Sequence, residues 1–165
     1  MTSENFFDST EVNKETPFLE FSYKSKKFSV KRQPMYDSEG QPTDGTKLLI
    51  FDTKGTQHGE ILGKFQIRDD GREDFFCEWF ENTFTGSSGD HTEGHISELI
   101  KETMAQCIVQ RKINNWVSST TILQGGIITY EALTHDERLN YQKELQPTPY
   151  MSGEPRYKYT FSLKA

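Results

Sequence analysis

Strict alternation of apolar and polar residues is clearest at the end of the chain and again in its middle. The final segment places apolar residues at every second position, which is the pattern of a strand with one buried face. These positions are Tyr157, Tyr159, Phe161 and Leu163. The same alternation over residues 60–68 predicts another strand, which ends in the turn-forming residues 69–71, Asp-Asp-Gly.

The N-terminal half carries further strand patterns. Residues 17–24 and 26–33 predict a β-hairpin, and residues 47–53 predict the next strand. Residues 33–46 between them hold two prolines and two glycines, and they predict a polar loop. Most of this half is therefore expected to be antiparallel sheet.

The period changes to that of a helix in two places. Phe75, Phe76, Trp79 and Phe80 fall at i, i+1, i+4 and i+5, and they predict a short helix over residues 73–83. A second helix is predicted from a capping-box pattern, Asp90 with Glu93 three residues later, and it extends to about residue 114. Its apolar stripe consists of Ile96, Leu99, Ile100, Met104, Cys107 and Ile108, with Arg111 at the edge.

The remaining C-terminal segments are predicted less uniquely. Residues 119–132 are strand-like, with a bulge expected at the two glycines 125 and 126. Thr134 and Glu137 match the cap of a short helix, but residues 139–145 match a strand equally well. Helices do not alternate with strands, so the sequence predicts a mainly β (α+β) fold. We expect an antiparallel β-barrel or sandwich with a short flanking helix and one longer inserted helix.

Composition narrows the class of protein. A chain of 165 residues with 33% hydrophobic residues and a mean hydropathy of −0.77 is expected to form one domain whose core relies on its aromatic residues. Residues 1–16 are polar and acidic and predict a flexible arm, which leaves residues 17–165 as the domain, with a helical insertion at about 90–114. The net charge of −6 argues against bulk binding to nucleic acid.

The N-terminal residues and the lengths of the apolar runs bear on cellular location. The N-terminal residues lack the basic and apolar regions of a signal peptide, and no apolar run has the length of a membrane span. Synthesis in the cytoplasm is therefore expected. Cys77 and Cys107 each lie in an apolar stripe, which predicts buried free thiols rather than a disulfide.

The order of the predicted elements resembles that of phage tail tube proteins and of the haemolysin-coregulated tube protein of type VI secretion. The matching segments are Phe18–Arg32, Gln33–Thr46, Lys47–Arg68, Glu73–Thr83, Ile122–Glu131 and Tyr157–Leu163. The turn Tyr36–Pro42 is similar to an Asp-x-x-Gly-x-Pro turn of type VI tube proteins, and Phe65–Trp79 is similar to the phage pattern. The helix near 91–114 departs from the family and would be an insertion on the outer surface.

This resemblance implies a non-enzymatic structural subunit without a cofactor, which assembles into stacked rings of a hollow tube in a virion tail or a contractile injection apparatus. Its partners would be copies of itself, as a hexamer, and sheath or baseplate proteins. No membrane would be involved, and nucleic acid would be only a passing cargo. The ring-stacking loop would contain Pro34, Met35, Tyr36, Asp37, Gly40 and Pro42, although a solvated hairpin loop explains these residues equally well.

Two other functions compete with the tube. The first alternative is a non-enzymatic α+β interaction or inhibitor protein, such as a viral one. The second is a nuclease, in which Asp44 and Asp52 would bind Mg²⁺ and Lys54 would orient the attacking water. The sequence around Asp52 and Lys54 is also ordinary turn chemistry.

Two further groups of residues could bind ligands. A basic hairpin with neighbouring aromatic residues could hold single-stranded nucleic acid, although lysines on a hairpin also prevent aggregation. Its basic residues are Lys24, Lys26, Lys27, Lys31 and Arg32. His91 and His95 with Glu98 have the spacing of a zinc site on a helix, but no third strong ligand accompanies them, so no metal is expected.

Overall fold

One open, mixed sheet of eight strands forms the body of the protein. The computed structural model describes residues 16–82, 93–119, 124–149, 153 and 155–165. The strands lie in the spatial order β2-β3-β4-β5-β6-β7-β9-β8. Within the described residues the two edge strands, β2 and β8, do not pair with each other, so the sheet does not close. The mainly β, α+β class is confirmed, and the predicted closed barrel is wrong.

The N-terminal half of the sheet is a five-stranded antiparallel meander. It consists of β2 (Leu19–Tyr23), β3 (Lys26–Tyr36), β4 (Pro42–Asp52), β5 (Gln57–Ile67) and β6 (Glu73–Asn82). The predicted hairpin and the strands at 47–53 and 60–68 are present. The predicted loop at 33–46 is wrong, because β3 and β4 continue through most of it. Pro34 is tolerated there because β2 pairs with β3 only as far as Val30.

The C-terminal half begins with a helical crossover. Its elements are α2 (Glu93–Val109), β7 (Asn115–Ser119), α3 (Gln124–Leu133), β8 (Leu139–Leu145) and β9 (Tyr157–Leu163). The connection through α2 makes β7 parallel to β6, whereas β9 is antiparallel to both β7 and β8. The closing strand matches its predicted range, and residues 139–145 form the strand that the sequence allowed.

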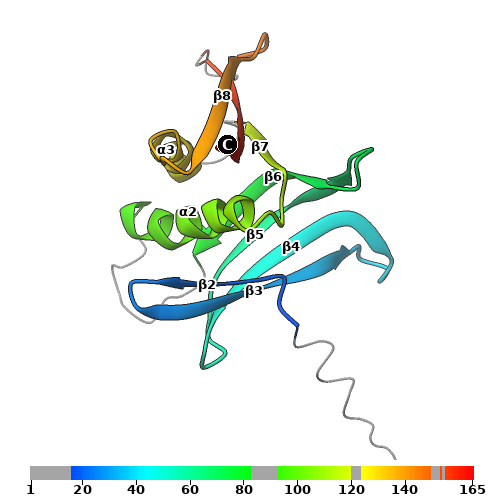
Figure 1. Ribbon diagram of the computed structural model, residues 1–165. Coiled ribbons are helices and arrows are strands. Elements are labelled where there is room, and N and C mark those ends of the chain that lie inside the picture. The colour runs from blue at the N-terminus through cyan, green and yellow to red at the C-terminus, as the bar shows by residue number, and fades with distance from the viewer. Residues whose placement is uncertain (1–15, 83–92, 120–123, 150–152, 154) are drawn as a thin grey trace, which may run out of the picture.

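Helix α2 lies inside the curve of the sheet. Figure 1 shows β2 and β3 on one side of α2 and β8 with α3 on the other, and α2 contacts strands of both halves. Met104, Ala105 and Cys107 on this helix are fully buried. The prediction that this helix is an insertion on the outer surface is therefore wrong, because the helix supplies part of the core.

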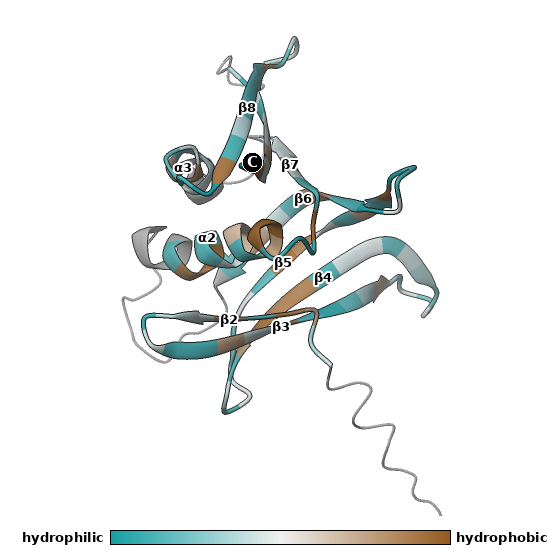
Figure 2. Ribbon diagram, in the orientation of Figure 1, coloured by the Kyte–Doolittle hydropathy of each residue, from teal (hydrophilic) through white to brown (hydrophobic). Residues whose placement is uncertain are grey.

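The apolar residues follow this arrangement. Figure 2 shows hydrophobic colour in the middle of β4 and towards the C-terminal end of α2, and hydrophilic colour at the outer ends of the hairpins. The fully buried side chains come from every layer of the fold. They include Val30, Leu48, Ile50, Ile61, Phe75, Ile108, Trp116, Tyr159 and Phe161. The aromatic core that the composition predicted is thus present.

Two predicted elements have the wrong type. Residues 73–83 were predicted to be a helix, but residues 73–82 form strand β6. Residues 119–132 were predicted to be one strand, but their described part contains the last residue of β7 and most of α3. The alternative of a capped helix beginning at Thr134 is also wrong, because α3 ends at Leu133.

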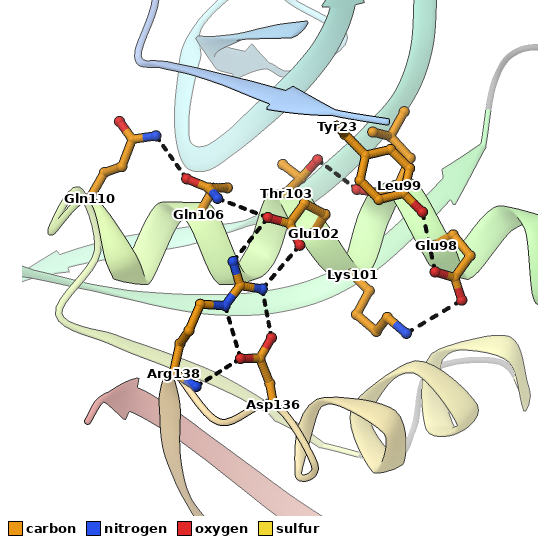
Figure 3. A network of polar contacts seen from close by, with 10 residues as sticks. All are labelled: Tyr23, Glu98, Leu99, Lys101, Glu102, Thr103, Gln106, Gln110, Asp136 and Arg138. Carbon is orange, nitrogen blue, oxygen red and sulfur yellow. Dashed lines mark hydrogen bonds and ion pairs between the residues drawn. The ribbon is translucent and has the colours of Figure 1, made fainter. Parts of the chain in front are cut away.

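A polar network holds α2 against the segment before β8. Figure 3 shows the Arg138 guanidinium between Glu102 and Asp136, with Nη1 and Nη2 donating to Glu102 at 3.1 and 3.0 Å. The hydrogen bond from Arg138 holds the pKa of Asp136 below its usual value. From Glu102 the network continues through Gln106 to Gln110, which donates to the Glu20 carbonyl of β2. Charge-assisted bonds thus join α2 to the C-terminal half, and a neutral hydrogen bond joins it to β2.

Cys77 and Cys107 are both buried and free, as predicted. None of the helices in the described ranges combines the length and the apolar composition needed to cross a membrane.

Candidate functional site

The sheet opens where the parallel pairing of β6 and β7 ends. Residues 75–77 of β6 pair with residues 116–118 of β7. Beyond this point β6 pairs only with β5, and β7 only with β9, among the residues described. The two parallel strands therefore separate at their carboxyl ends, immediately after Cys77 and Ser118. Open sheets with parallel strands commonly bind ligands at such carboxyl ends.

A β-bulge in β6 coincides with this separation. Leu62 of β5 pairs with Trp79, but the next residue, Gly63, pairs with Cys77, so Glu78 is the extra residue. Bulges end strand pairing and redirect side chains, and they are frequent beside functional sites. From Glu78 onward the outer backbone groups of β6 have no strand partner in the described part of the chain. An extended ligand that carries amide groups can pair with such an edge.

Four buried polar side chains lie at the separation, and we call them the fork: Cys77, Trp116, Ser118 and Tyr130. The Ser118 hydroxyl donates to the Cys77 carbonyl at 3.4 Å. The Tyr130 hydroxyl and Trp116 Nε1 make no hydrogen bond of ordinary geometry within the described ranges, although Cys77, Ser118 and Trp116 lie close enough to the Tyr130 hydroxyl to affect its pKa. A buried polar group without a partner costs about 1–3 kcal/mol, so such groups in a native fold require an explanation.

Burial dominates the electrostatics of the fork. It raises the pKa of Tyr130 well above the usual tyrosine value, and the neighbouring Cys77 thiol acts in the same direction. Burial also raises the pKa of the Cys77 thiol to about 12. Both groups therefore keep their protons at neutral pH. The fork presents proton donors and no thiolate nucleophile.

Aromatic packing holds the Tyr130 hydroxyl in place. The Tyr130 ring stacks on Tyr159 and Phe161 of β9, at 5.7 and 6.1 Å between centroids, and meets Phe80 of β6 edge-on. Trp116 packs on Phe75 at 4.8 Å. These contacts give the two unpartnered donors fixed positions on α3 and β7, so the fork is a rigid site rather than a loop site.

The basic hairpin does not present a stacking platform. Lys24, Lys26 and Lys27 are exposed, but Arg32 donates to both carboxylate oxygens of Glu73 at 2.9 and 3.0 Å and lies over the Phe65 ring. Lys31 lies 5.2 Å from the centre of the Phe51 ring. The neighbouring aromatic residues, Phe28 and Tyr23, are not free to stack on bases either. Phe28 is buried and Tyr23 donates a hydrogen bond to Glu98.

The six residues of the predicted ring-stacking loop belong to the β3–β4 hairpin, whose pairing shifts register between Pro34 and Tyr36. Pro34, Met35 and Tyr36 are in β3, and Pro42 begins β4. The Asp37 carboxylate accepts hydrogen bonds from the backbone N–H groups of residues 39 and 41, and Gly40 adopts a positive φ of 81°. Tyr36 is 60% exposed. These contacts close a short turn.

The structure does not bring the nuclease residues together. Asp44 and Asp52 are eight residues apart on β4, which corresponds to about 26 Å along a strand. Asp44 is exposed beside Lys64, whereas Asp52 binds His58 and the backbone N–H of Lys54. The magnesium site of the nuclease alternative is therefore absent.

The predicted histidine pair falls partly outside the structural description. His91 and the side chain of His95 are not among the described groups, and Glu98 contacts Tyr23 and Lys101. Across the described residues, no three histidine, cysteine or acidic side chains are grouped as a metal site.

Sequence reasoning missed the fork. Cys77 was recognised only as a buried thiol, and Trp116, Ser118 and Tyr130 were not identified as site residues. The sequence held one indication of the site, the odd spacing between inward-facing residues of β6. A bulge produces such a spacing. The proximity of Tyr130 to Cys77 depends on the crossover and is not visible in the sequence.

No protein-family model matches this sequence, and none of the curated proteins matches it. The spermidine/spermine N-acetyltransferase SpeG from Vibrio cholerae, solved with manganese ions, is similar in structure, with a TM-score of 0.44 and 7% identity over 81% of this chain and 92% of that chain. An N-acetyltransferase from Staphylococcus aureus Mu50 has a TM-score of 0.37 and 15% identity over 72% of this chain and 67% of that chain.

These observations correct the predicted identity. The resemblance to tail tube proteins is wrong, because its short helix is strand β6 and its barrel is an open sheet. The predictions of a hexameric ring with sheath or baseplate partners and of a virion component are wrong with it. The prediction of a non-enzymatic protein is not kept either: acetyltransferase is the activity named for the solved structures above, and the interaction-protein and nuclease alternatives gain no support.

Proposed function

We propose that this chain is an acyltransferase that moves an acyl group from a thioester to an amine, with the fork at its centre. The observation that carries the proposal is the buried, unpartnered Tyr130 hydroxyl at the point where the parallel strands β6 and β7 separate. N-acetyltransferase is the activity named for the similar structures, and it identifies the reaction to test. The residues of the fork carry the proposal.

The fork fits an acyl thioester whose thiol is carried on an amide-containing arm. The free edge of β6 beyond the Glu78 bulge offers backbone N–H and C=O groups to the amides of such an arm. Trp116 Nε1 adds a donor that has no other partner in the described residues. When bound, the thioester supplies an activated carbonyl carbon. The protein supplies a rigid edge and two donors beside it.

Tyr130 is the residue proposed to hold the reacting proton. Because burial keeps its phenol protonated, its hydroxyl can donate to the sulfur that leaves as the carbon–sulfur bond breaks. The amine nitrogen forms the new bond to the carbonyl carbon and loses one proton, which restores the phenol. The net charge of −6 favours the approach of cationic amines.

The test is acetyl transfer from acetyl coenzyme A to spermidine, followed by mass spectrometry of the amine product. We expect wild-type protein to form N-acetylated product and Tyr130→Phe to reduce kcat at least tenfold. Removing a hydroxyl that makes no hydrogen bond of ordinary geometry should change the free energy of unfolding little. The activity loss would then be separate from any loss of fold.

Tyr159→Phe is the matched control, since Tyr159 is a buried tyrosine whose hydroxyl bonds to Glu131 rather than pointing to the fork. This variant should lose some stability and keep its kcat at temperatures where it is folded. Absence of acetyl transfer by wild-type protein to spermidine and to a panel of other amines, together with absence of acetyl coenzyme A binding in calorimetry, would refute the proposal.

A further inference from the structure

A separate cavity lies at the other end of the parallel strands, where α2 finishes and β6 and β7 begin. Its volume is about 480 Å³. It is lined by the turn before β6, the connection from α2 to β7, and the end of β9. The fork is at the carboxyl ends of β6 and β7, so the two sites do not overlap. We call this second site the basic cavity.

Four cationic side chains line the basic cavity: Arg72, Arg111, Lys112 and Lys164. One carboxylate side chain, that of Glu73, also lines it. The two bonds from Arg32 occupy the Glu73 carboxylate and lower its pKa. The lining side chains therefore carry a formal charge of 4 − 1 = +3, in a chain whose net charge is −6.

Most of the cationic side chains in this cavity form no polar contact with the described part of the protein. The side chains of Arg111, Lys112 and Lys164 make no hydrogen bond or ion pair with any described residue. Arg72 Nη1 donates to Asn114 Oδ1 at 3.4 Å, and Arg72 Nε lies 4.0 Å from Asp70 Oδ2. Only Arg72 has a counter-charge, that of Asp70, within the described ranges. The other three cations repel one another, so an anion bound between them would lower the free energy of the site.

The four cations of the basic cavity are not all explained by a role in ending helix α2. Arg111 has φ = 63°, a left-handed conformation in which a side chain is disfavoured and glycine is preferred at the end of a helix. The backbone of Lys112 completes the helix end by donating to the Cys107 carbonyl, and glycine at position 111 would permit the same bond. The helix dipole favours cations here. However, Arg72 and Lys164 come from other elements.

We infer that the basic cavity binds an organic phosphate of mononucleotide size. Guanidinium and ammonium groups are the usual ligands of phosphate oxygens, and several of them converge here. The buried side chains of Ile108 and Ile113 provide an apolar wall for the carbon part of the ligand. The volume lies within the usual range of small-molecule sites, roughly 300–1,000 Å³. This inference is independent of the proposed acyl transfer.

Arg111→Gly tests the inference without threatening the fold. Calorimetric titration of the full chain with ADP, pyrophosphate and adenosine should show binding of the two phosphate compounds and none of adenosine alone. Arg111→Gly should weaken ADP binding at least tenfold. Its thermal unfolding temperature should be unchanged or higher, because glycine relieves the left-handed strain.

Lys24→Gly is the matched control, since Lys24 is also a cation at positive φ (51°) but lies in the turn between β2 and β3, outside the cavity. It removes the same charge and should leave ADP affinity unchanged. The inference is overturned if wild-type protein binds neither ADP nor pyrophosphate at millimolar concentration. Equal weakening by the two variants would also overturn it, because that result indicates bulk electrostatics rather than a site.

Discussion

Asp52 organises the turn between β4 and β5 with one carboxylate. Its Oδ1 accepts from the backbone N–H groups of Lys54 and Thr56, both at 2.9 Å, and its Oδ2 lies 2.9 Å from His58 Nε2. The His58 hydrogen bond and these backbone bonds lower the pKa of Asp52 to about 2. The residue that resembled a metal ligand in the sequence is therefore a turn-forming residue, which is the role that the Asp-Thr-Lys-Gly pattern also allowed.

We predict that Asp52 makes the free energy of unfolding decrease at acidic pH. Its pKa is lower in the folded chain than in the unfolded chain, so the carboxylate stabilises the fold above about pH 4, and that contribution is lost as the pH falls towards 2. Asp52→Asn keeps the acceptor oxygen but removes the titration. Urea midpoints measured from pH 6 to pH 2 should therefore fall less steeply in Asp52→Asn than in wild-type protein.

The exposed Asp44, on the same strand, supplies the control for this comparison. Asp44→Asn should follow the wild-type curve over the whole pH range. If Asp52→Asn follows that curve as well, the turn does not depend on the ionised carboxylate.

At the scale of elements, the bulge in β6 explains why its sequence resembles a helix. Phe75, Cys77 and Phe80 are the buried residues of this strand. Strict alternation would place 75 and 80 on opposite faces, but the extra residue Glu78 reverses the alternation and returns Phe80 to the core side. The resulting spacing imitates a helical stripe. A local pattern could not reveal the bulge, because the partner strand defines it.

The other element errors have similar causes. The apolar residues after position 121 fit a buried strand or a buried helix, and only the packing of Tyr130 and Leu133 inside α3 decides between them. Strand β9 and residues 59–67 of β5 were predictable because one face of each is buried and the alternation there is unbroken; the extra residue of β5, His58, precedes this stretch. The site was not predictable, since its residues meet only through the crossover from β6 to β7.

Gly63 makes the bulged pairing possible, and we predict that it cannot be replaced by alanine. A Cβ at this position would lie 2.3 Å from the Phe76 carbonyl and 2.6 Å from the Phe75 ring. Neither the backbone nor this buried ring can move freely, so Gly63→Ala should destabilise the protein by about 2–4 kcal/mol. Chemical denaturation measures the difference.

Gly59 on the same strand provides a graded comparison. Its added Cβ would lie 3.0 Å from the flexible end of Ile100 and 3.2 Å from the Glu81 carbonyl. Gly59→Ala should therefore cost clearly less than Gly63→Ala. Equal costs would mean that the bulge imposes no special closeness at Gly63.

At the scale of the whole molecule, packing on α2 compensates for the short pairing between β6 and β7, which joins the two halves of the sheet. Among the described residues, strand pairing between the two halves of the sheet is limited to residues 75–77 with 116–118. Helix α2 packs on strands of both halves, and the Arg138 network connects it to the C-terminal half (Figure 3). The core is therefore continuous across the joint, and we expect it to unfold as one unit.

The two tryptophans allow this to be measured, because Trp79 is in the N-terminal half on β6 and Trp116 is in the C-terminal half on β7. Trp116→Phe leaves Trp79 as the only reporter, and Trp79→Phe leaves Trp116. In each variant the urea transition followed by tryptophan fluorescence should coincide with that followed by far-ultraviolet circular dichroism. Met104→Ala, which opens a cavity in α2, should lower the stability by about 2–5 kcal/mol and move both transitions together. A Trp116 transition that precedes the circular dichroism transition would mean that the C-terminal half unfolds by itself and that α2 does not unite the sheet.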